Sequence, residues 1–156
     1  MKMFKSFLFL LLTGISLNLF AQDMPAEMKT ALQTDDTTKI ATLITKDNIN
    51  NCYKEGNWSY TLLAQTIRAN AKKCFDYLIA QGADVNHACE GYVPPLMHAA
   101  KYGRLDMVKV LVAKGAKVDY VYDGDYEPAS GQSALTYAEA NQQTAVADFL
   151  RALKKN

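Results

Sequence analysis

The sequence lacks the features typical of a nucleic-acid-binding module, a disulfide-built miniprotein or an enzyme. Its 156 residues carry 17 basic and 16 acidic side chains, and a near-neutral balance argues against the basic patch that binds nucleic acid. Three cysteines are too few for a fold built on disulfides. The sequence contains no His-Glu-x-x-His, no cysteine pair at metal-ligand spacing, no phosphate-binding glycine loop and no Gly-x-Ser-x-Gly motif. We therefore expect no enzymatic activity, no cofactor and no metal site.

The first 21 residues have the pattern of a secretory signal peptide. Lys2 and Lys5 precede the apolar run at 7–12, and the small residue Ala21 comes just before the chain turns polar. A membrane anchor is the alternative, but a span takes about 20 predominantly apolar residues, and this run is interrupted between residues 13 and 18. We expect cleavage after Ala21, as in Gram-negative bacteria, and a periplasmic or secreted chain without a membrane span.

An internal repeat organises the remaining sequence. The phrase Gly-Ala-Asp-Val-Asn at 82–86 returns as Gly-Ala-Lys-Val-Asp at 115–119, an offset of 33 residues. Apolar positions match at the same offset, for example Leu78 with Leu111. A period of this length predicts a solenoid of stacked repeats. The spacing of Leu96, Ala99 and its neighbours predicts helices with one apolar face.

These phrases resemble the ankyrin repeat. The segment 94–100 reads Pro-Pro-Leu-Met-His-Ala-Ala, and it is followed by Gly103, an apolar helix and Gly115-Ala116. The resemblance implies an all-α, helix-turn-helix solenoid of about four repeats with projecting finger loops. The domain would cover residues 22–156, with approximate repeats at 24–51, 52–86, 87–119 and 120–156. Gly103 and Gly115 are expected to be left-handed at the helix ends.

The three cysteines divide into two groups. Cys74 matches an apolar position of the repeat and is expected to be a buried thiol. Cys52 and Cys89 follow the closing turns of adjacent repeats. Packed neighbours lie about 8–10 Å apart, whereas a disulfide needs Cα atoms within about 7 Å. Extra residues between 50 and 63 provide the slack for a Cys52–Cys89 bridge, and free thiols are the alternative.

The inter-repeat loops carry the functional signal. Most of the nine tyrosines and the only tryptophan map to these loops or to the end of a first helix. In ankyrin proteins residues at such positions bind partner proteins. Tyr and Trp side chains provide a large contact area at low cost in conformational entropy. Arg68 and Lys101, matched at the repeat offset, add positive charge. The candidate partner-binding residues are Trp58, Tyr60, Arg68, Tyr92, Lys101, Tyr102, Tyr120, Tyr122 and Tyr126, and Tyr53 lies in the same group of aromatics.

The expected function is an exported, monomeric adaptor that binds another protein. Its partner would be a periplasmic enzyme that it stabilises or a toxic enzyme that it neutralises. An alternative is a small-ligand or calcium-binding module that uses the acidic, tyrosine-rich loop 119–130, although its spacing does not match the twelve-residue calcium loop. His98 is expected to be hydrogen-bonded within the stack and not catalytic.

Overall fold

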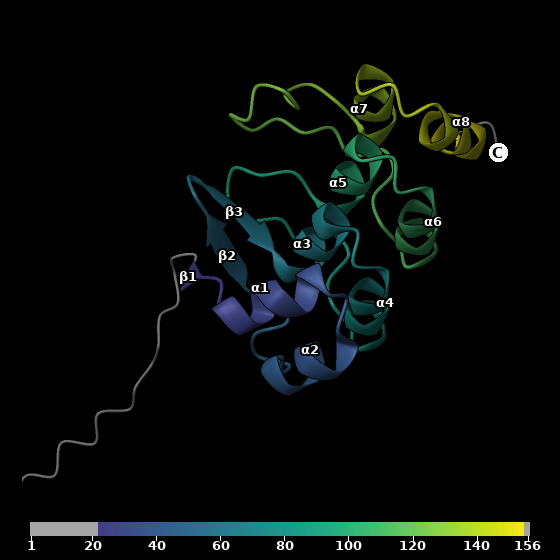
Figure 1. The fold of residues 1–156 in the computed structure, drawn as a ribbon. Helices are drawn as coiled ribbons and strands as arrows, with labels where there is room; N and C mark the ends of the chain where they lie inside the picture. The colour runs from purple at the N-terminus through teal and green to yellow at the C-terminus, as the bar shows by residue number, and fades with distance from the viewer. Residues whose placement is uncertain (1–21, 155–156) are drawn as a thin grey trace, which may run out of the picture.

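The computed structural model describes residues 22–154, so the expected signal peptide lies outside the described residues. Within this range eight helices form four helix-turn-helix pairs. Figure 1 shows the pairs stacked in chain order. The helices are α1 (Ala26–Gln33), α2 (Thr37–Leu43), α3 (Leu62–Ala69), α4 (Lys72–Ala80), α5 (Pro95–Lys101), α6 (Leu105–Ala113), α7 (Ala134–Ala140) and α8 (Thr144–Leu153).

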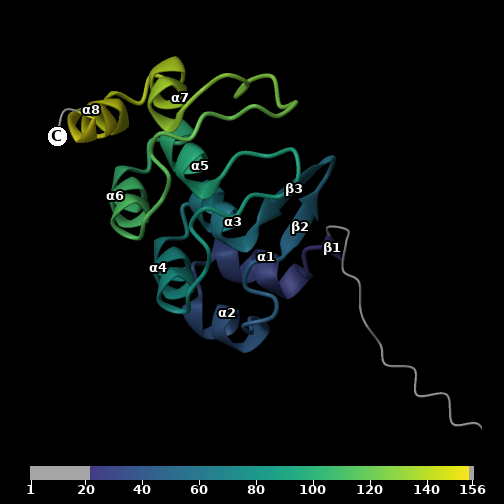
Figure 2. The same cartoon turned by 180° about the vertical axis from the view of Figure 1, so that it is seen from behind.

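The stack has an inner and an outer layer of helices. The first helices of the pairs pack on one another, α1 on α3, α3 on α5 and α5 on α7, while α2 packs on α4 and α6 on α8. Figures 1 and 2 both show the loops before α5 and α7 projecting away from the side that holds α4, α6 and α8. The loops of successive repeats therefore come together on one side of the molecule.

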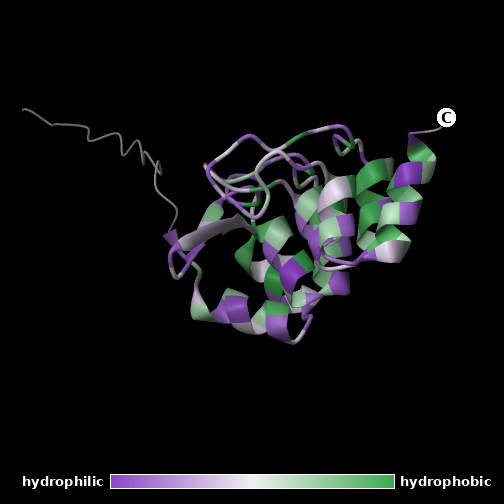
Figure 3. Cartoon of the chain, turned by 90° about the horizontal axis from the view of Figure 1, so that it is seen from above, coloured by the Kyte–Doolittle hydropathy of each residue, from purple (hydrophilic) through white to green (hydrophobic). Residues whose placement is uncertain are grey.

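Each helix has an apolar face that only a neighbouring helix can cover. Leu96, Ala99 and Leu111 are buried, as their spacing predicted. Figure 3 shows hydrophobic and hydrophilic residues on the helices around the stack, the pattern of amphipathic elements. Cys74 is buried and free, and burial, reinforced by nearby Asp35, raises the pKa of its thiol to about 12. The core is thus spread along the stack.

One left-handed residue closes the first helix of every pair. Gly103 has φ 65°, and the equivalent residues Asp35, Asn70 and Gln142 have φ values of 51°, 56° and 60°. Gly115 is left-handed after α6, with φ 87°. The two glycines therefore adopt the expected conformation. Of the four turns within helix pairs, only the one at Gly103 uses glycine, which adopts the left-handed conformation without a steric penalty from a Cβ atom.

The chain also contains a small sheet, so the expectation of an all-α fold is wrong in this respect. The strands β1 (Gln22–Asp23), β2 (Cys52–Glu55) and β3 (Trp58–Thr61) pair in that order. β2 and β3 form an antiparallel hairpin with Cys52 opposite Thr61, and β1 runs parallel to β2. The extra residues between α2 and α3, rich in residues that favour strands, form this hairpin instead of a simple loop.

Polar side chains tie successive repeats together at their turns. The Asp35 carboxylate accepts hydrogen bonds from the backbone N–H groups of Lys73 and Cys74, at 3.0 and 2.8 Å. Asn50 accepts one from the N–H of Asp84, and Asn86 repeats this contact with the following repeat. These bonds fix the spacing of the loops. Between residues 22 and 154, no helix has the length and apolar character needed to cross a bilayer.

Candidate functional site

Three loops place aromatic side chains beside one another on the loop side of the stack. Trp58 and Tyr60 alternate along β3, Tyr92 precedes α5, and Tyr126 lies in the long loop before α7. The ring centres of Trp58 lie 6.0 Å from Tyr92 and 5.4 Å from Tyr126, both edge to face. Tyr60 lies 5.8 Å from Tyr92. We call these four residues the aromatic cluster.

The inner side of the aromatic cluster contains two cations of the chain itself. The Arg68 guanidinium lies 3.8 Å from the ring centre of Tyr60 and forms an ion pair with Glu55. Burial alone would raise the pKa of the Glu55 carboxyl, but the hydrogen bond and charge of Arg68 outweigh it and hold the pKa below its usual value. The charge of Arg68 is thus used within the chain.

Lys101 is the second cation. Its ammonium lies 5.7–5.9 Å from the ring centres of Tyr102, Tyr126 and Tyr137, and it donates a hydrogen bond of 3.4 Å to the Tyr126 hydroxyl. An ammonium at this range is attracted by the negative faces of the rings. The positive charge expected from Lys101 is therefore present but enclosed by tyrosines.

His98 forms the floor of the aromatic cluster. Its ring lies edge to face with Tyr60 at 5.4 Å, and only 6% of the residue is exposed. Burial, together with the charges of Arg68 and Lys101, lowers the pKa of the imidazole to about 3. Its Nε2 atom is buried and has no hydrogen-bond partner within the described residues. The hydrogen bond expected for His98 within the stack is therefore not made at Nε2 by any group of the described residues.

Two hollows share the wall made by Trp58, Tyr92 and Tyr126. The inner one, above His98, has a volume of only about 20 Å³, which is room for about one water molecule. The outer one has a volume of about 540 Å³ and opens towards solvent. Its other lining residues are Glu90, Gly91, Asp125, Glu127 and Pro128.

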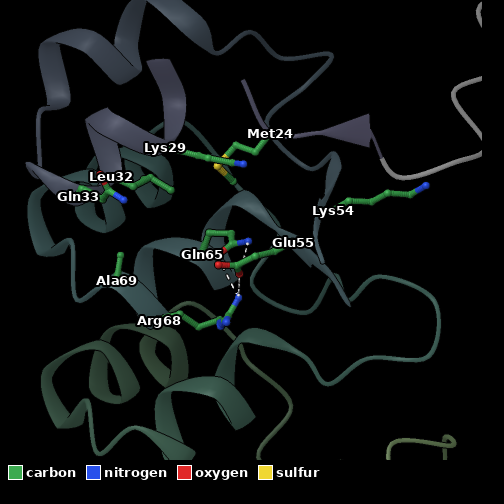
Figure 4. Close-up of a pocket in the computed structure, with 9 residues that line it drawn as sticks. All are labelled: Met24, Lys29, Leu32, Gln33, Lys54, Glu55, Gln65, Arg68 and Ala69. Carbon is green, nitrogen blue, oxygen red and sulfur yellow. Dashed lines mark hydrogen bonds and ion pairs between the residues drawn. The ribbon is translucent and has the colours of Figure 1, made fainter. Parts of the chain in front are cut away.

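A separate cavity of about 280 Å³ lies between α1, α3 and β2. Figure 4 shows Arg68 and Gln65 directed at Glu55 on one side of it, with Lys29 and Met24 on another. Gln65 donates a hydrogen bond of 3.3 Å to the Glu55 carboxylate. Glu55 therefore binds both Gln65 and Arg68 on this side, and Arg68 links this cavity to the aromatic cluster.

A disulfide joins the bases of the first two loops. Cys52 and Cys89 are bonded, with their Cα atoms 5.8 Å apart. The start of the β2–β3 hairpin is thereby attached to the loop that carries Tyr92. In the same region the Tyr92 hydroxyl donates a hydrogen bond of 3.1 Å to the carbonyl of Asn57 in the hairpin turn.

Comparison with known proteins identifies the scaffold. The family model described as ankyrin repeats in three copies matches residues 28–122 and 94–156. The chain belongs to the ankyrin-repeat family. An ankyrin repeat protein of fowlpox virus (strain NVSL) is 32% identical over 97 residues, which is 62% of this chain and 16% of that protein. The human ankyrin repeat and KH domain-containing protein 1 is 44% identical over 62 residues, 40% of this chain and 2% of that protein.

A third ankyrin relative comes from the armadillo Dasypus novemcinctus. Its ankyrin repeat, SAM and basic leucine zipper domain-containing protein 1 is 44% identical over 45 residues, 29% of this chain and 10% of that protein. The chain thus spans less than a fifth of the length of each of these three relatives. Ankyrin repeats are generally modules for protein–protein interaction, and ankyrin-repeat proteins are typically not enzymes.

Two of the tyrosines expected on the ankyrin loop surface do not lie on it. Tyr122 is only 2% exposed, and its hydroxyl donates to the carbonyl of Gly91 at 2.8 Å and accepts from the N–H of Tyr126 at 3.2 Å. Gly124 packs so closely that a Cβ there would collide with the Tyr122 hydroxyl. Tyr122 therefore anchors the loop instead of facing a partner. Tyr53 is buried beneath the sheet, with 1% exposed.

The other candidates are divided between the cluster and its surroundings. Trp58 is 45% exposed, and Tyr60, Tyr92, Tyr126, Lys101 and Tyr102 are half-buried around the two hollows. Tyr120 is 36% exposed but does not line either hollow. The structure thus brings together most of the candidates and leaves Tyr120 outside.

Gln65 and Tyr137, two buried polar residues in register with His98, were not among the expected site residues. Gln65, His98 and Tyr137 occupy the same position in three successive ankyrin repeats once the longer third loop is allowed for, and all three are buried. Polar residues recurring on an otherwise apolar inner-helix face were the signal available. No cluster of three His, Cys, Asp or Glu side chains suited to a metal ion occurs in residues 22–154.

Proposed function

We propose that this chain is an exported ankyrin-repeat protein that binds another protein through the aromatic cluster. The observation that carries the proposal is the convergence of Trp58, Tyr60, Tyr92 and Tyr126 from three loops onto one partly exposed surface. Loops on a rigid scaffold are common sites of binding, and aromatic residues contribute strongly to protein interfaces.

The proposed partner is an enzyme outside the cytoplasm, which the protein either stabilises or neutralises. Support for this location is the signal-like pattern of residues 1–21 and the Cys52–Cys89 disulfide, a bond that persists in oxidising compartments. The protein acts as a monomer and needs no cofactor. Intact-mass measurement of the exported chain should give a product beginning at Gln22, and a product that retains residues 1–21 would contradict the proposed cleavage.

Affinity capture from a periplasmic extract tests the surface. Trp58→Ala and Tyr126→Ala should each lower recovery of the partner at least tenfold, because each removes an aromatic ring from the centre of the cluster. Tyr120→Ala is the matched control, since it removes an exposed tyrosine outside the cluster, and its recovery should equal that of the wild type. Equal recovery by all four proteins would exclude this surface.

The role of the captured partner is then read from its own activity. A neutraliser lowers the turnover of the enzyme when added at equal concentration. A stabiliser leaves turnover unchanged and lengthens the half-life of the enzyme at elevated temperature. Light scattering of the free protein should give the mass of one chain, and a dimer mass would contradict the proposed monomer.

A further inference from the structure

The inner and outer sides of the aromatic cluster differ in charge. On the inner side, Arg68 and Lys101 already lie against tyrosine rings. On the outer side, the hollow of about 540 Å³ is lined by three carboxylates, those of Glu90, Asp125 and Glu127. None of these three takes part in an ion pair within residues 22–154.

We propose that this outer hollow receives an arginine side chain of the protein partner. The proposal rests on the proposed function and specifies the chemistry that the surface recognises. A guanidinium is planar, stacks on aromatic faces and is more weakly hydrated than an ammonium, so it suits a hollow with aromatic walls and an acidic rim. The occupant-binding residues are Trp58, Glu90, Tyr92, Asp125, Tyr126 and Glu127.

A contact within the chain shows how an aromatic ring and a carboxylate together bind a cation at this surface. The guanidinium of Arg68 stacks over Tyr60 and pairs with the nearby carboxylate of Glu55. The outer hollow repeats this combination of ring and carboxylate with Trp58, Tyr126 and its three carboxylates, but without a cation of its own. Charge complementarity therefore favours a basic side chain over an acidic or purely apolar one.

The floor of the cluster restricts how deep the arginine enters. The inner hollow has room for about one water molecule, and Lys101 lines it and would repel a second cation. The guanidinium therefore stays at the rim, within reach of the carboxylates. His98, whose buried Nε2 has no partner in the described residues, is one of the residues that line the inner hollow.

The first test uses a peptide probe and the fluorescence of Trp58, the only tryptophan of the chain. Acetyl-Gly-Gly-Arg-Gly-Gly-amide should change the emission saturably, whereas the norleucine counterpart, which has a similar apolar stem and no charge, should not. The lysine counterpart should bind severalfold more weakly. Equal binding of the norleucine peptide would overturn the proposal, and equal binding of the lysine peptide would overturn the preference for a guanidinium.

A variant without the three carboxylates of the hollow, which we call the rim acids, tests their part in binding. Glu90→Gln/Asp125→Asn/Glu127→Gln keeps the shape of the side chains and should weaken binding of the arginine peptide at least fivefold. The matched control Asp23→Asn/Asp47→Asn/Asp76→Asn removes three exposed acids that do not line the hollow, and it should bind like the wild type. Thermal melts of both variants show that each is folded. An unchanged affinity of the rim variant would overturn the proposal.

Capture of the partner separates this inference from the proposed function. If Trp58→Ala abolishes capture and the rim variant does not, the surface is correct and the arginine assignment is wrong. If neither change affects capture, the proposed surface itself is wrong. If both abolish it, and added salt weakens capture by the wild type, both proposals are supported, because exposed charge pairs are screened by salt.

Discussion

The two loops that face each other across the outer hollow are held in different ways. The hairpin of β2 and β3 is fixed by a ladder of backbone hydrogen bonds and by the Cys52–Cys89 disulfide. The loop between α6 and α7 contains a single isolated bridge, between Val121 and Ser133. It is linked to the preceding repeat by the Tyr122 hydroxyl, which donates to the carbonyl of Gly91, and by Lys101, which donates to the Tyr126 hydroxyl.

This difference gives the hollow one rigid wall and one adjustable wall. Trp58 lies on the wall with covalent support. Tyr126, Asp125 and Glu127 lie on a wall that only non-covalent contacts hold, among them the hydroxyl of the buried Tyr122. A rigid aromatic anchor lowers the entropic cost of binding, and an adjustable wall can adapt to a partner. The comparison predicts that changes in the stack, the disulfide, the floor and Tyr122 have distinct effects.

The largest effect is expected from the stack beneath both walls. Leu111→Ala removes a fully buried side chain of α6 and should lower the free energy of unfolding by about 2–5 kcal/mol, as large-to-small core changes do. Denaturant unfolding measures this change. Lys114→Ala, an exposed position just beyond the same helix, is the control. A melt of Leu111→Ala that matches the wild type would contradict the shared support of the two walls.

The disulfide should affect the hairpin wall and the loop that carries Tyr92, which it joins, but not the loop between α6 and α7. Cys52→Ser/Cys89→Ser removes a bond between residues 37 positions apart and should cost about 2–4 kcal/mol of stability. Hydrogen exchange should rise in residues 52–61 and stay unchanged in 120–132. A reducing agent should lower the melting temperature of the wild type and leave that of the double variant unchanged. Equal loss of protection in both loops would contradict the distinction between the walls.

Low pH should lower the stability of the fold through His98, the floor of the aromatic cluster. The pKa of His98 is about 3 in the folded chain, below the ordinary 6.5. Between pH 6.5 and 3 the unfolded chain therefore binds a proton that the folded chain does not, so stability falls as the pH falls through this window. The loss from this group at pH 5, relative to neutral pH, is about 2 kcal/mol.

The control for the acid effect is His98→Gln, which has no imidazole to titrate. Unfolding free energies of both proteins between pH 7 and 4 give the slopes to compare, and a lower stability of the variant at pH 7 does not affect that comparison. The variant should show the flatter slope, since only the wild type loses the His98 contribution. Because His98 contacts Tyr60 of β3, the hairpin should lose protection first. Identical slopes would contradict the assignment.

The repeat period was sufficient to predict the helices and much of the cluster, because buried positions follow the 33-residue offset. The apolar face at Leu96, Ala99 and Leu111 needs only helical spacing, and Trp58, Tyr92 and Tyr126 were placed by the loops they occupy. The hairpin was not predicted, since an insertion has no counterpart in the repeat from which its shape can be inferred. The length of the segment between α2 and α3 showed that it contains additional residues, but not that these residues pair as strands.

Burial within the loops was equally beyond the sequence. The sequence pattern around a tyrosine in a long loop does not show whether its side chain faces solvent or packs back onto the protein. Tyr122 packs back because its hydroxyl donates to the carbonyl of Gly91 and because Gly124 leaves room for its ring. The charge of Lys101 was predicted, but its enclosure by Tyr102, Tyr126 and Tyr137 depends on how three elements meet. Such long-range contacts are set by packing and not by local pattern.

The smallest and most local effect is expected at Tyr122. Tyr122→Phe keeps the ring in its buried site and removes the hydroxyl that joins Gly91 to Tyr126. The stability cost should be about 1 kcal/mol, the net worth of a typical hydrogen bond. Tyr120→Phe is the matched control, because that exposed side chain lies two residues away.

The readout that separates the two walls is hydrogen exchange. Tyr122→Phe should raise exchange at residues 120–132 and leave residues 52–61 protected, the reverse of the result expected for the disulfide variant. It should also weaken binding of the arginine peptide severalfold, because the acids of the adjustable wall lose their fixed position. Wild-type exchange in residues 120–132 of this variant would show that the loop is held by contacts other than Tyr122, and the hollow would then have two rigid walls.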